Sequence, residues 1–400
     1  MSHDTQEIVI VSACRTPIGA FGGSLKDLRA YELAGVVMTE ALKRAGIDGA
    51  DVDEVIAGDC IQCPDEANTA RNAALSIGIP VEVPAYTVQK QCSSSMQALS
   101  SARAQILAGD ADTVLVVGTE SMSNGPYILP TARWGQRLQD GAMVDSVWEI
   151  LHSGSSLVGT RMIMGQTAEN LAEIHSITRE EQDEIALRSN NNAEAATTSG
   201  RFAEEITPVT IKGRKGDTVV DSDEHTRFGM KMEDLSRLKP IFAEGGSVTA
   251  GNSSGLNDGA SAAVVMRRSK ADEMGIKPLA RIVNQSSAGV KPEIMGYGPV
   301  PATEKVLHKA GLSLEDIGLI EINEAFAAQY LACEKGLGLD RERVNVNGSG
   351  IGLGHPIGAT GLRIVVSLIH EMRRRDEQHG LAALCVGGGM GMATVLQLVE

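Results

Sequence analysis

The sequence is poor in aromatic residues, since Phe, Trp and Tyr make up 3% of its 400 residues. Its core must therefore be built mostly from Ala, Val, Leu, Ile and Met, which suit close-packed helices and strands. Glycine is abundant, with 44 residues, and allows backbone segments to approach one another closely. A hydrophobic share of 42% and a charged share of 22% are typical of a globular protein and argue against global disorder.

Basic residues are outnumbered, with 36 Lys and Arg against 51 Asp and Glu and a formal net charge of −15. This balance argues against nucleic acid or an anionic membrane surface as the main partner, although a local basic pocket can still hold an anion. Long hydrophobic runs are also lacking, because none approaches the roughly 20 residues needed to span a bilayer. The N-terminus leads directly into the strand-like run 8–11 without a basic region, so we expect no signal peptide.

Cysteine is sparse as well, and six residues in a chain of this length do not make a disulfide scaffold. We therefore expect free thiols and a cytoplasmic location. Cys60 and Cys63 form a single C-x-x-C pair. Because no second pair or nearby histidine completes a zinc site, we expect no metal site.

Short apolar runs alternate with helical patterns, which predicts crossover units and a mainly parallel sheet. The first series of such segments comprises residues 8–11, 31–45, 54–58 and 113–118. A similar order returns about 265 to 270 residues later. Segments 40–47, 53–58, the small-residue helix after Cys92 and 113–118 correspond to segments 305–312, 318–323, 358–373 and 381–387. This offset predicts two homologous halves.

The segment between the two halves differs from them in composition. Both tryptophans and the charged run 212–239 fall between about residue 123 and residue 246, which predicts a long insertion packed over the paired halves. Lys212, Arg214, Lys215 and Arg227 of that run could meet a phosphate, but acidic residues are interspersed, so we interpret most of the run as solvated surface.

Cys92 follows an apolar approach and precedes a helical pattern that Gly109 can end. A helix N-terminus presents unpaired backbone N–H groups and a positive dipole end, both of which favour the thiolate. Cys92 is therefore a candidate nucleophile, although an unassigned cysteine is often a small buried hydrophobe.

Three further segments contain candidate residues. Cys385 ends a strand-like run and is followed by Gly387-Gly-Gly, which can bind an anion through its N–H groups or simply form a tight turn. His355 lies among glycines and before a proline, as a general base or a structural turn histidine would. Asn323 follows a strand and opens an Ala-rich helix, where it can cap the helix or orient a carbonyl or water.

In combination these segments are far more specific than any one alone. Cys92 with its small-residue helix, Asn323-Glu-Ala-Phe-Ala, Gly354-His-Pro-Ile-Gly and Cys385-Val-Gly-Gly-Gly-Met-Gly, in this order, resemble the thiolase family. The resemblance covers essentially the whole chain. It includes the stretches 11–19, 168–170, 179–183, 212–216 and 249–260.

The resemblance implies an α/β fold in which two duplicated halves form a five-layer αβαβα core with an inserted loop domain. We place the first half at residues 1–122 and 247–275. The loop domain, which would cover CoA and make oligomer contacts, is placed at 123–246, and the second half at 276–400. By the same resemblance the protein would be a homotetramer built as a dimer of dimers.

The resemblance also implies catalytic roles. Cys92 would take an acyl group from a CoA thioester, His355 would accept its proton, and Cys385 would remove the α-proton of a second acyl-CoA. Asn323 and His355 would form one oxyanion site, with a water on Asn323, and the backbone N–H groups of Cys92 and Gly387 would form the other. A thiolate exchanges readily with a thioester, so a covalent acyl-cysteine divides a difficult transfer into two steps.

The expected reaction is the reversible condensation of two acetyl-CoA molecules to acetoacetyl-CoA and CoA, with CoA and acyl-CoA as substrates and no permanently bound cofactor. Six residues match substrate-contacting positions of the family, namely Arg227, Ser254, Met164, Met295, Ala325 and Phe326. For the methionines, simple core filling is the alternative.

Some positions depart from the family pattern. Ile163 stands where short-chain members have histidine, and Cys92 is followed by three serines in place of Gly-Ser-Gly. The alternative function is therefore a degradative 3-ketoacyl-CoA thiolase for a longer or unusual acyl group. Two other hypotheses are a condensing enzyme that uses carrier-protein thioesters, against which Cys385 argues, and a CoA-binding protein that has lost catalysis.

Overall fold

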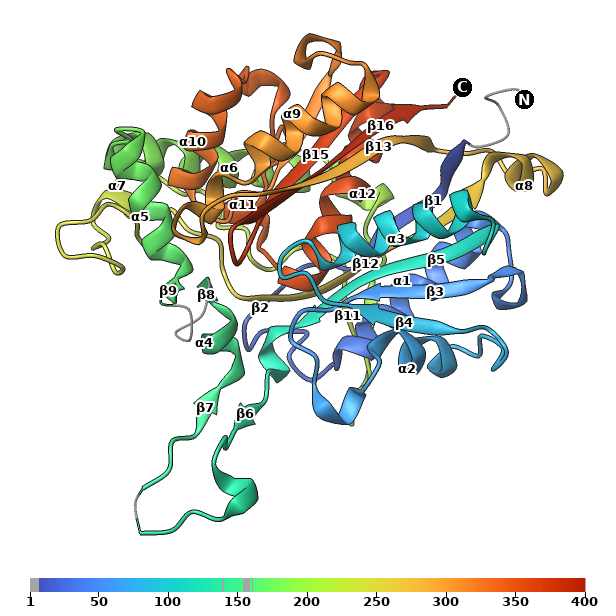
Figure 1. Cartoon of the computed structure of the whole chain (residues 1–400), viewed down its shortest axis with the longest axis horizontal. Coiled ribbons are helices and arrows are strands. Elements are labelled where there is room, and N and C mark those ends of the chain that lie inside the picture. The colour runs from blue at the N-terminus through green and yellow to red at the C-terminus, as the bar shows by residue number, and fades with distance from the viewer. Residues whose placement is uncertain (1–6, 139, 154–158, 160, 400) are drawn as a thin grey trace.

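The computed structural model describes residues 7–138, 140–153, 159 and 161–399. Its centre is one ten-stranded sheet, in which nine strands form a continuous path made from two similar parts and the short β2 (Gly19–Ala20) pairs with β12 (Asn257–Arg267) (Figure 1). The first part has the strand order β4 (Ala85–Val88), β3 (Glu54–Gly58), β5 (Thr113–Ser121), β12 (Asn257–Arg267) and β1 (Ile8–Arg15). The second part has the order β14 (Leu319–Ile322), β15 (His379–Val386), β16 (Met390–Leu398) and β13 (Ala280–Gly289).

The two parts repeat one topology, as the sequence predicted. Beside β14, Ile320 forms an isolated parallel bridge with Val344. The backbone at Val344 therefore lies next to β14 as β4 lies next to β3. A short antiparallel pairing of β1 with β13, at Val9 with Arg281 and Ile10 with Ala280, joins the parts. The duplication is therefore continuous through hydrogen bonds at the centre of the molecule.

Helices form three layers around the two parts of the sheet. The outer layer of the first part contains α1 (Ala30–Ala45) and α2 (Thr69–Ser76), and that of the second contains α9 (Pro299–Ala310) and α10 (Ala327–Leu337). Between the parts lie α3 (Ser94–Ala108) and α12 (Ile357–Arg375), which contact each other (Figure 1). Helix α3 packs on strands of the first part, and α12 contacts strands of both parts. Three buried apolar clusters fill the spaces between these layers, which form the five-layer αβαβα core.

The sheet is mixed, so the prediction of a mainly parallel sheet is wrong. Strands β3, β4 and β5 are parallel, as are β14 and β15, but β12, β1, β16 and β13 run antiparallel to their neighbours. Strand β16 returns from β15 through a glycine turn. Strand β12 runs back beside β5 after the insertion. The insertion leaves the sheet at the C-terminal end of β5 and returns at the same end of the strand pair.

The segment between β5 and β12 contains most of the irregular structure. Its helices are α4 (Ser146–Ile150), α5 (Met164–Ile174), α6 (Arg179–Thr198) and α7 (Met232–Ser236). Its strands pair as β6 (Tyr127–Ile128) with β7 (Val144–Asp145), β8 (His152–Ser153) with β9 (Met162–Ile163), and β10 (Val209–Ile211) with β11 (Thr218–Val220). The exposed side chains of Lys212, Arg214 and Lys215 confirm the interpretation of that run as solvated surface.

The remaining elements are β2 (Gly19–Ala20), α8 (Arg268–Glu273) and α11 (Gly350–Leu353). All six cysteines are free thiols, as expected. Among the described helices, none combines the length and apolar character needed to cross a membrane.

Candidate active site

The two central helices bring two of the predicted residues to one end of the core. The first turns of α3 and α12 touch, since the Leu362 N–H donates to Ser95 Oγ over 2.9 Å. Cys92 lies two residues before α3 and His355 two residues before α12. The prediction that a helix follows Cys92 and ends at Gly109 is confirmed, because Gly109 adopts a left-handed conformation with φ of 84°.

Cys92 is a buried thiol on a constrained turn. Gln91, immediately before it, has a positive φ of 49°. Burial raises the pKa of Cys92 to about 11, although the backbone N–H groups of Gly387 and of Cys92 itself bond to its sulfur and lower the pKa. The N–H donors thus favour the thiolate, as the sequence argument expected, but desolvation outweighs them in the resting protein. The nucleophile needs a base.

His355 is held as an unprotonated base. Its Nδ1 lies 2.7 Å from Thr360 Oγ1, and that hydroxyl donates its hydrogen to the carbonyl of Pro356 over 2.8 Å. The hydroxyl oxygen must then accept from Nδ1–H, which leaves Nε2 with a free lone pair. Burial, and next the charge of Arg363, lower the pKa of His355 to about 3. Within the described residues, the buried Nε2 has no hydrogen-bond partner.

Asn323 and Cys385 emerge from neighbouring parallel strands, β14 and β15. The backbone N–H of Asn323 donates to the Ala383 carbonyl over 3.0 Å. Its side-chain Nδ2 is buried and unpartnered among the described atoms. Burial, and next the charge of nearby Cys92, raise the pKa of Cys385 well above its usual value. Because the carboxyl ends of parallel strands meet at one edge, the amide and the second thiol face the same region.

The glycine turn after Cys385 is shaped around the nucleophile. A Cβ atom at Gly387 would lie 2.6 Å from Met164 Cε and 3.4 Å from the side chain of Gln91. Gly388 and Gly389 adopt φ of 89° and 90°, which disfavour side chains. Glycine at 387 thus allows its N–H to approach the Cys92 sulfur.

An apolar wall adjoins the Cys385 thiol. Met164, Met295, Ala325 and Phe326 belong to the same buried cluster as Cys385. Phe326 also packs edge-on against Phe242, with ring centroids 6.1 Å apart. The structure therefore brings the four predicted pocket residues together with one predicted catalytic residue, and their contact with an acyl group stays a prediction.

The two predicted CoA contacts differ in setting. Ser254 lies beside this wall, because its N–H donates to the Ala325 carbonyl over 2.9 Å. Arg227 is exposed on the insertion, where its backbone N–H donates to Asn190 Oδ1. The Arg227 guanidinium has no hydrogen bond or ion pair with any described residue, and is available to an anion.

Sequence reasoning missed two residues behind the site. Thr360 fixes the His355 tautomer, and its place in the glycine-rich loop gave no sign of that role. Arg363 is completely buried beside Asn323. Its signal was present in the sequence, since a single arginine interrupts the apolar stretch 362–369 of a predicted helix.

A cluster near the C-x-x-C pair has the geometry of metal ligands. Atoms of Cys63, Asp65 and Glu66 lie within 4.8 Å of one another. Arg29 already forms ion pairs with both carboxylates, so the cluster is explained without an ion.

Comparison with known proteins gives full-length matches. The family models "Thiolase, N-terminal domain" and "Thiolase, C-terminal domain" match residues 8–269 and 276–398. The chain is 51% identical to an acetyl-CoA acetyltransferase of Syntrophomonas wolfei, covering 98% of this chain and 99% of that one. It is 49% identical to the beta-ketothiolase BktB of Cupriavidus necator, covering 99% and 100%.

Solved structures are equally similar. The crystal structure of the Bacillus anthracis acetyl-CoA acetyltransferase superposes with a TM-score of 0.97 at 56% identity, covering 100% of both chains. That of human mitochondrial 3-ketoacyl-CoA thiolase in complex with CoA superposes with a TM-score of 0.95 at 42% identity, covering 99% of both.

Proposed function

This chain belongs to the thiolase family, and on that premise we propose that it forms and cleaves carbon–carbon bonds between acyl groups carried as CoA thioesters. The reaction is the condensation of two acetyl-CoA molecules to acetoacetyl-CoA and free CoA, or its reverse, thiolysis. The observation that carries the proposal is that the two touching helices α3 and α12 begin just after a buried neutral thiol, Cys92, and an imidazole, His355, whose Nε2 is unprotonated.

In the first half-reaction, His355 Nε2 takes the proton of Cys92, and the thiolate attacks the thioester carbonyl. The carbonyl oxygen becomes negatively charged and accepts from the N–H groups of Cys92 and Gly387, which already point at the sulfur. The tetrahedral intermediate then expels the CoA thiolate, which receives the proton of Cys385, so that Cys385 is left as a thiolate and His355 stays protonated. An acetyl group remains on Cys92.

In the second half-reaction, a Cys385 thiolate removes the α-proton of a second acetyl-CoA. The resulting enolate oxygen accepts from Asn323 Nδ2 and from His355 in its protonated form. The enolate carbon attacks the acetyl carbonyl on Cys92, the carbon–sulfur bond breaks, and acetoacetyl-CoA leaves. The Cys92 thiolate takes back the proton from His355, which restores the resting site. In thiolysis the same steps run backwards, and a CoA thiolate collects the acetyl group from Cys92.

Mass spectrometry of the intact protein after incubation with acetyl-CoA tests this proposal. We expect one acetyl group on the peptide that contains Cys92, and none in a Cys92→Ser variant. A Cys92→Ser protein with full thiolysis activity would overturn the proposal. Absence of both labelling and thiolysis in the wild type would indicate instead a CoA-binding protein without catalysis, and activity with carrier-protein thioesters alone would indicate the other condensing class.

The acyl-chain preference is a second question, on which one position bears directly. Ile163 is half-buried immediately before Met164, at the start of α5. An apolar side chain there favours the alternative of a degradative thiolase for longer acyl groups. A series of kcat/KM values over chain length in the thiolysis direction, compared between the wild type and Ile163→His, distinguishes the two specificities.

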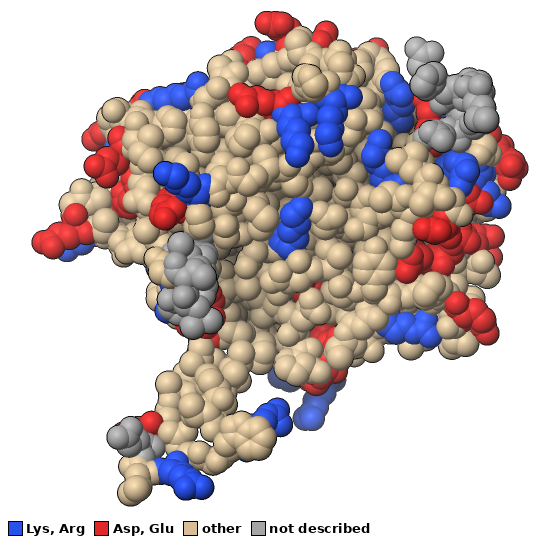
Figure 2. All heavy atoms as spheres, viewed as in Figure 1, with Lys and Arg blue, Asp and Glu red and all other residues tan. Residues whose placement is uncertain are grey.

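We further propose that the protein is a cytoplasmic homotetramer and that the β6–β7 hairpin supplies oligomer contacts. The hairpin projects from the body of the molecule (Figures 1 and 2). Its apolar side chains are exposed, with Trp134 at 87% and Leu138 at 103%. Large apolar groups presented in this way are typical of surfaces that a protein partner covers.

A further inference from the structure

Arg363 is a buried cation with an incomplete set of partners. It lies on α12 and is 1% exposed. Its Nη2 donates a long hydrogen bond of 3.4 Å to Asn323 Oδ1, and its Nη1 lies 4.0 Å from Glu321 Oε2. Its Nε and Nη1 have no hydrogen-bond partner among the described atoms. A buried guanidinium with so few contacts is costly, so stability alone does not account for it.

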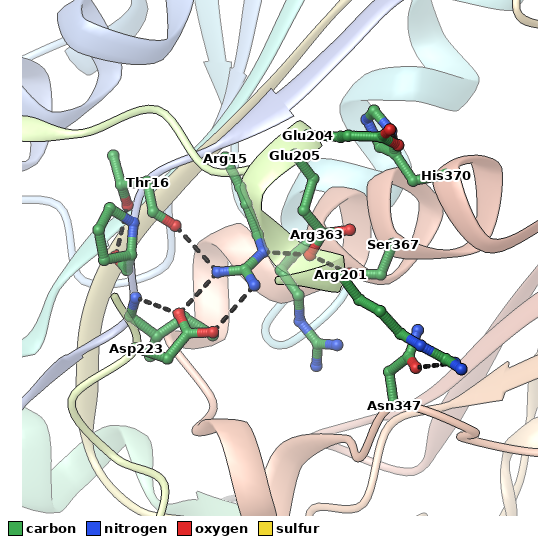
Figure 3. A network of polar contacts seen from close by, with 12 residues as sticks. Arg15, Thr16, Arg201, Glu204, Glu205, Asp223, Asn347, Arg363, Ser367 and His370 are labelled. Carbon is green, nitrogen blue, oxygen red and sulfur yellow. Dashed lines mark hydrogen bonds and ion pairs between the residues drawn. The ribbon is translucent and has the colours of Figure 1, made fainter. Parts of the chain in front are cut away.

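The neighbouring charges are engaged elsewhere. Arg15 bonds to Glu205 through Nε over 2.6 Å and to both oxygens of Asp223. Figure 3 shows these bonds, while the guanidinium of Arg363 points away from that group. Burial raises the pKa of Glu321 to about 8, so near neutral pH this side chain is mostly an uncharged acid. Asn323 is thus the one group to which Arg363 makes a direct hydrogen bond within the described structure.

This contact decides which way the Asn323 amide faces. A guanidinium has donors and no acceptor, so it can bond to the oxygen end of a carboxamide and repels the NH2 end. A Cβ atom at Gly350 would lie 2.8 Å from Asn323 Oδ1, so the oxygen is enclosed on a second side as well. The buried Nδ2 is left pointing away from Arg363 without a partner.

We propose that Arg363 is a positioning residue that acts through Asn323, holding the amide so that Nδ2 donates to the enolate oxygen of the second acyl-CoA. This inference rests on the proposed function and names how that site is preorganised. A donor fixed before the reaction stabilises developing charge without reorganisation at the moment of reaction. The positive charge of Arg363 contributes less than burial to the low pKa of His355, so that Nε2 stays free to accept a proton without it.

The test separates the two half-reactions. In Arg363→Met, α-proton exchange of acetyl-CoA in D2O and steady-state thiolysis should fall on the order of 10- to 100-fold, because enolate stabilisation is lost. Acetylation of Cys92 by acetyl-CoA should change less than about threefold, since Asn323 has no part in that step. Arg363→Lys, which keeps a donor and no acceptor, should recover part of the lost exchange.

A double-mutant cycle tests whether Arg363 acts through Asn323. The variant with both Asn323→Ala and Arg363→Met should exchange no more slowly than Asn323→Ala alone. Ser367→Ala is the matched control, because Ser367 lies one turn further along α12 and bonds to Glu205 rather than to Asn323. We expect it to retain wild-type exchange within about twofold.

Three outcomes would overturn the inference: unchanged exchange in Arg363→Met, equal losses in both half-reactions, or losses that multiply in the double variant. If Arg363→Met does not fold, the comparison of Arg363→Lys with Asn323→Ala decides by the same criteria. A wild type without Cys92 acetylation would instead refute the proposed function, so the two failures are distinguishable.

Discussion

The hydroxyl of Thr360 determines the tautomer of His355. Thr360 Oγ1 has one hydrogen, which it donates to the Pro356 carbonyl, so it faces His355 Nδ1 as an acceptor at 2.7 Å. The neutral imidazole therefore keeps its proton on Nδ1, and Nε2 is the basic nitrogen. A residue outside the reacting groups thus selects the nitrogen that can accept the proton of Cys92.

Thr360→Val should impair catalysis with little change in shape. Valine removes the acceptor, so the buried Nδ1–H loses its partner and the imidazole is no longer held with Nε2 unprotonated. We expect kcat/KM for thiolysis to fall by about 10- to 100-fold, a part of the roughly 10²- to 10⁴-fold that a placed general base contributes. Thr360→Ser, which keeps the hydroxyl, is the matched control and should stay close to wild type. Equal activity of Thr360→Val and Thr360→Ser would contradict the assignment.

The resting Cys92 should react slowly with alkylating reagents at neutral pH. Because burial raises its pKa to about 11, the thiolate fraction grows as pH rises toward that value. Iodoacetamide labelling in a Cys385→Ser background, followed at the Cys92 peptide by mass spectrometry, should still be accelerating above pH 9. A labelling rate that is already at its plateau at pH 7 would show a stabilised thiolate and contradict this picture.

The stability advantage of Glu321→Gln over the wild type should be larger at alkaline than at acidic pH. The folded protein holds a proton on Glu321 up to about pH 8, whereas the unfolded chain releases it near the ordinary value of 4.5. Between these values the native state binds more protons, so this group lowers wild-type stability as pH rises. Thermal melts at pH 5 and pH 8 should give a Tm difference between variant and wild type that increases by several degrees.

The direction in which the Tm difference between variant and wild type changes with pH decides between the two interpretations. Below pH 4.5 both states are protonated, so the glutamine should behave nearly as the wild type. A Tm advantage that shrinks as pH rises would mean that Glu321 is ionised in the native state and paired with Arg363.

Local patterns in the sequence were sufficient for much of the fold. The order of helices and strands, the duplication, and the helix that follows Cys92 all depend on periodicity and on glycine stops, which act over a few residues. The direction of β12 was missed because it depends on where the chain re-enters the sheet after the insertion. That is a property of the whole fold rather than of residues 257–267.

The candidate site divides in the same way. Cys92, His355, Asn323 and Cys385 were identifiable because each lies in a distinctive local motif. Their electrostatic properties could not be predicted from the sequence, because the pKa of Cys92 depends on burial between layers that meet only after folding. The contact of Arg363 with Asn323 joins α12 to the loop after β14, and no pattern along the chain reports it.

The β6–β7 hairpin offers the test of the proposed tetramer. Trp134→Glu combined with Leu138→Glu places two charges on side chains that are 87% and 103% exposed in the single chain, so folding of each subunit should be unaffected. If these side chains are buried between subunits, the charges must be desolvated and the assembly should dissociate to a smaller species. Light scattering measures the mass directly. Val219→Glu, at an exposed apolar position on the β10–β11 hairpin, is the matched control and should leave the mass unchanged. A wild type that is monomeric would contradict the proposed tetramer. A double variant that keeps the tetramer mass would show that the hairpin is not needed for the contacts between subunits.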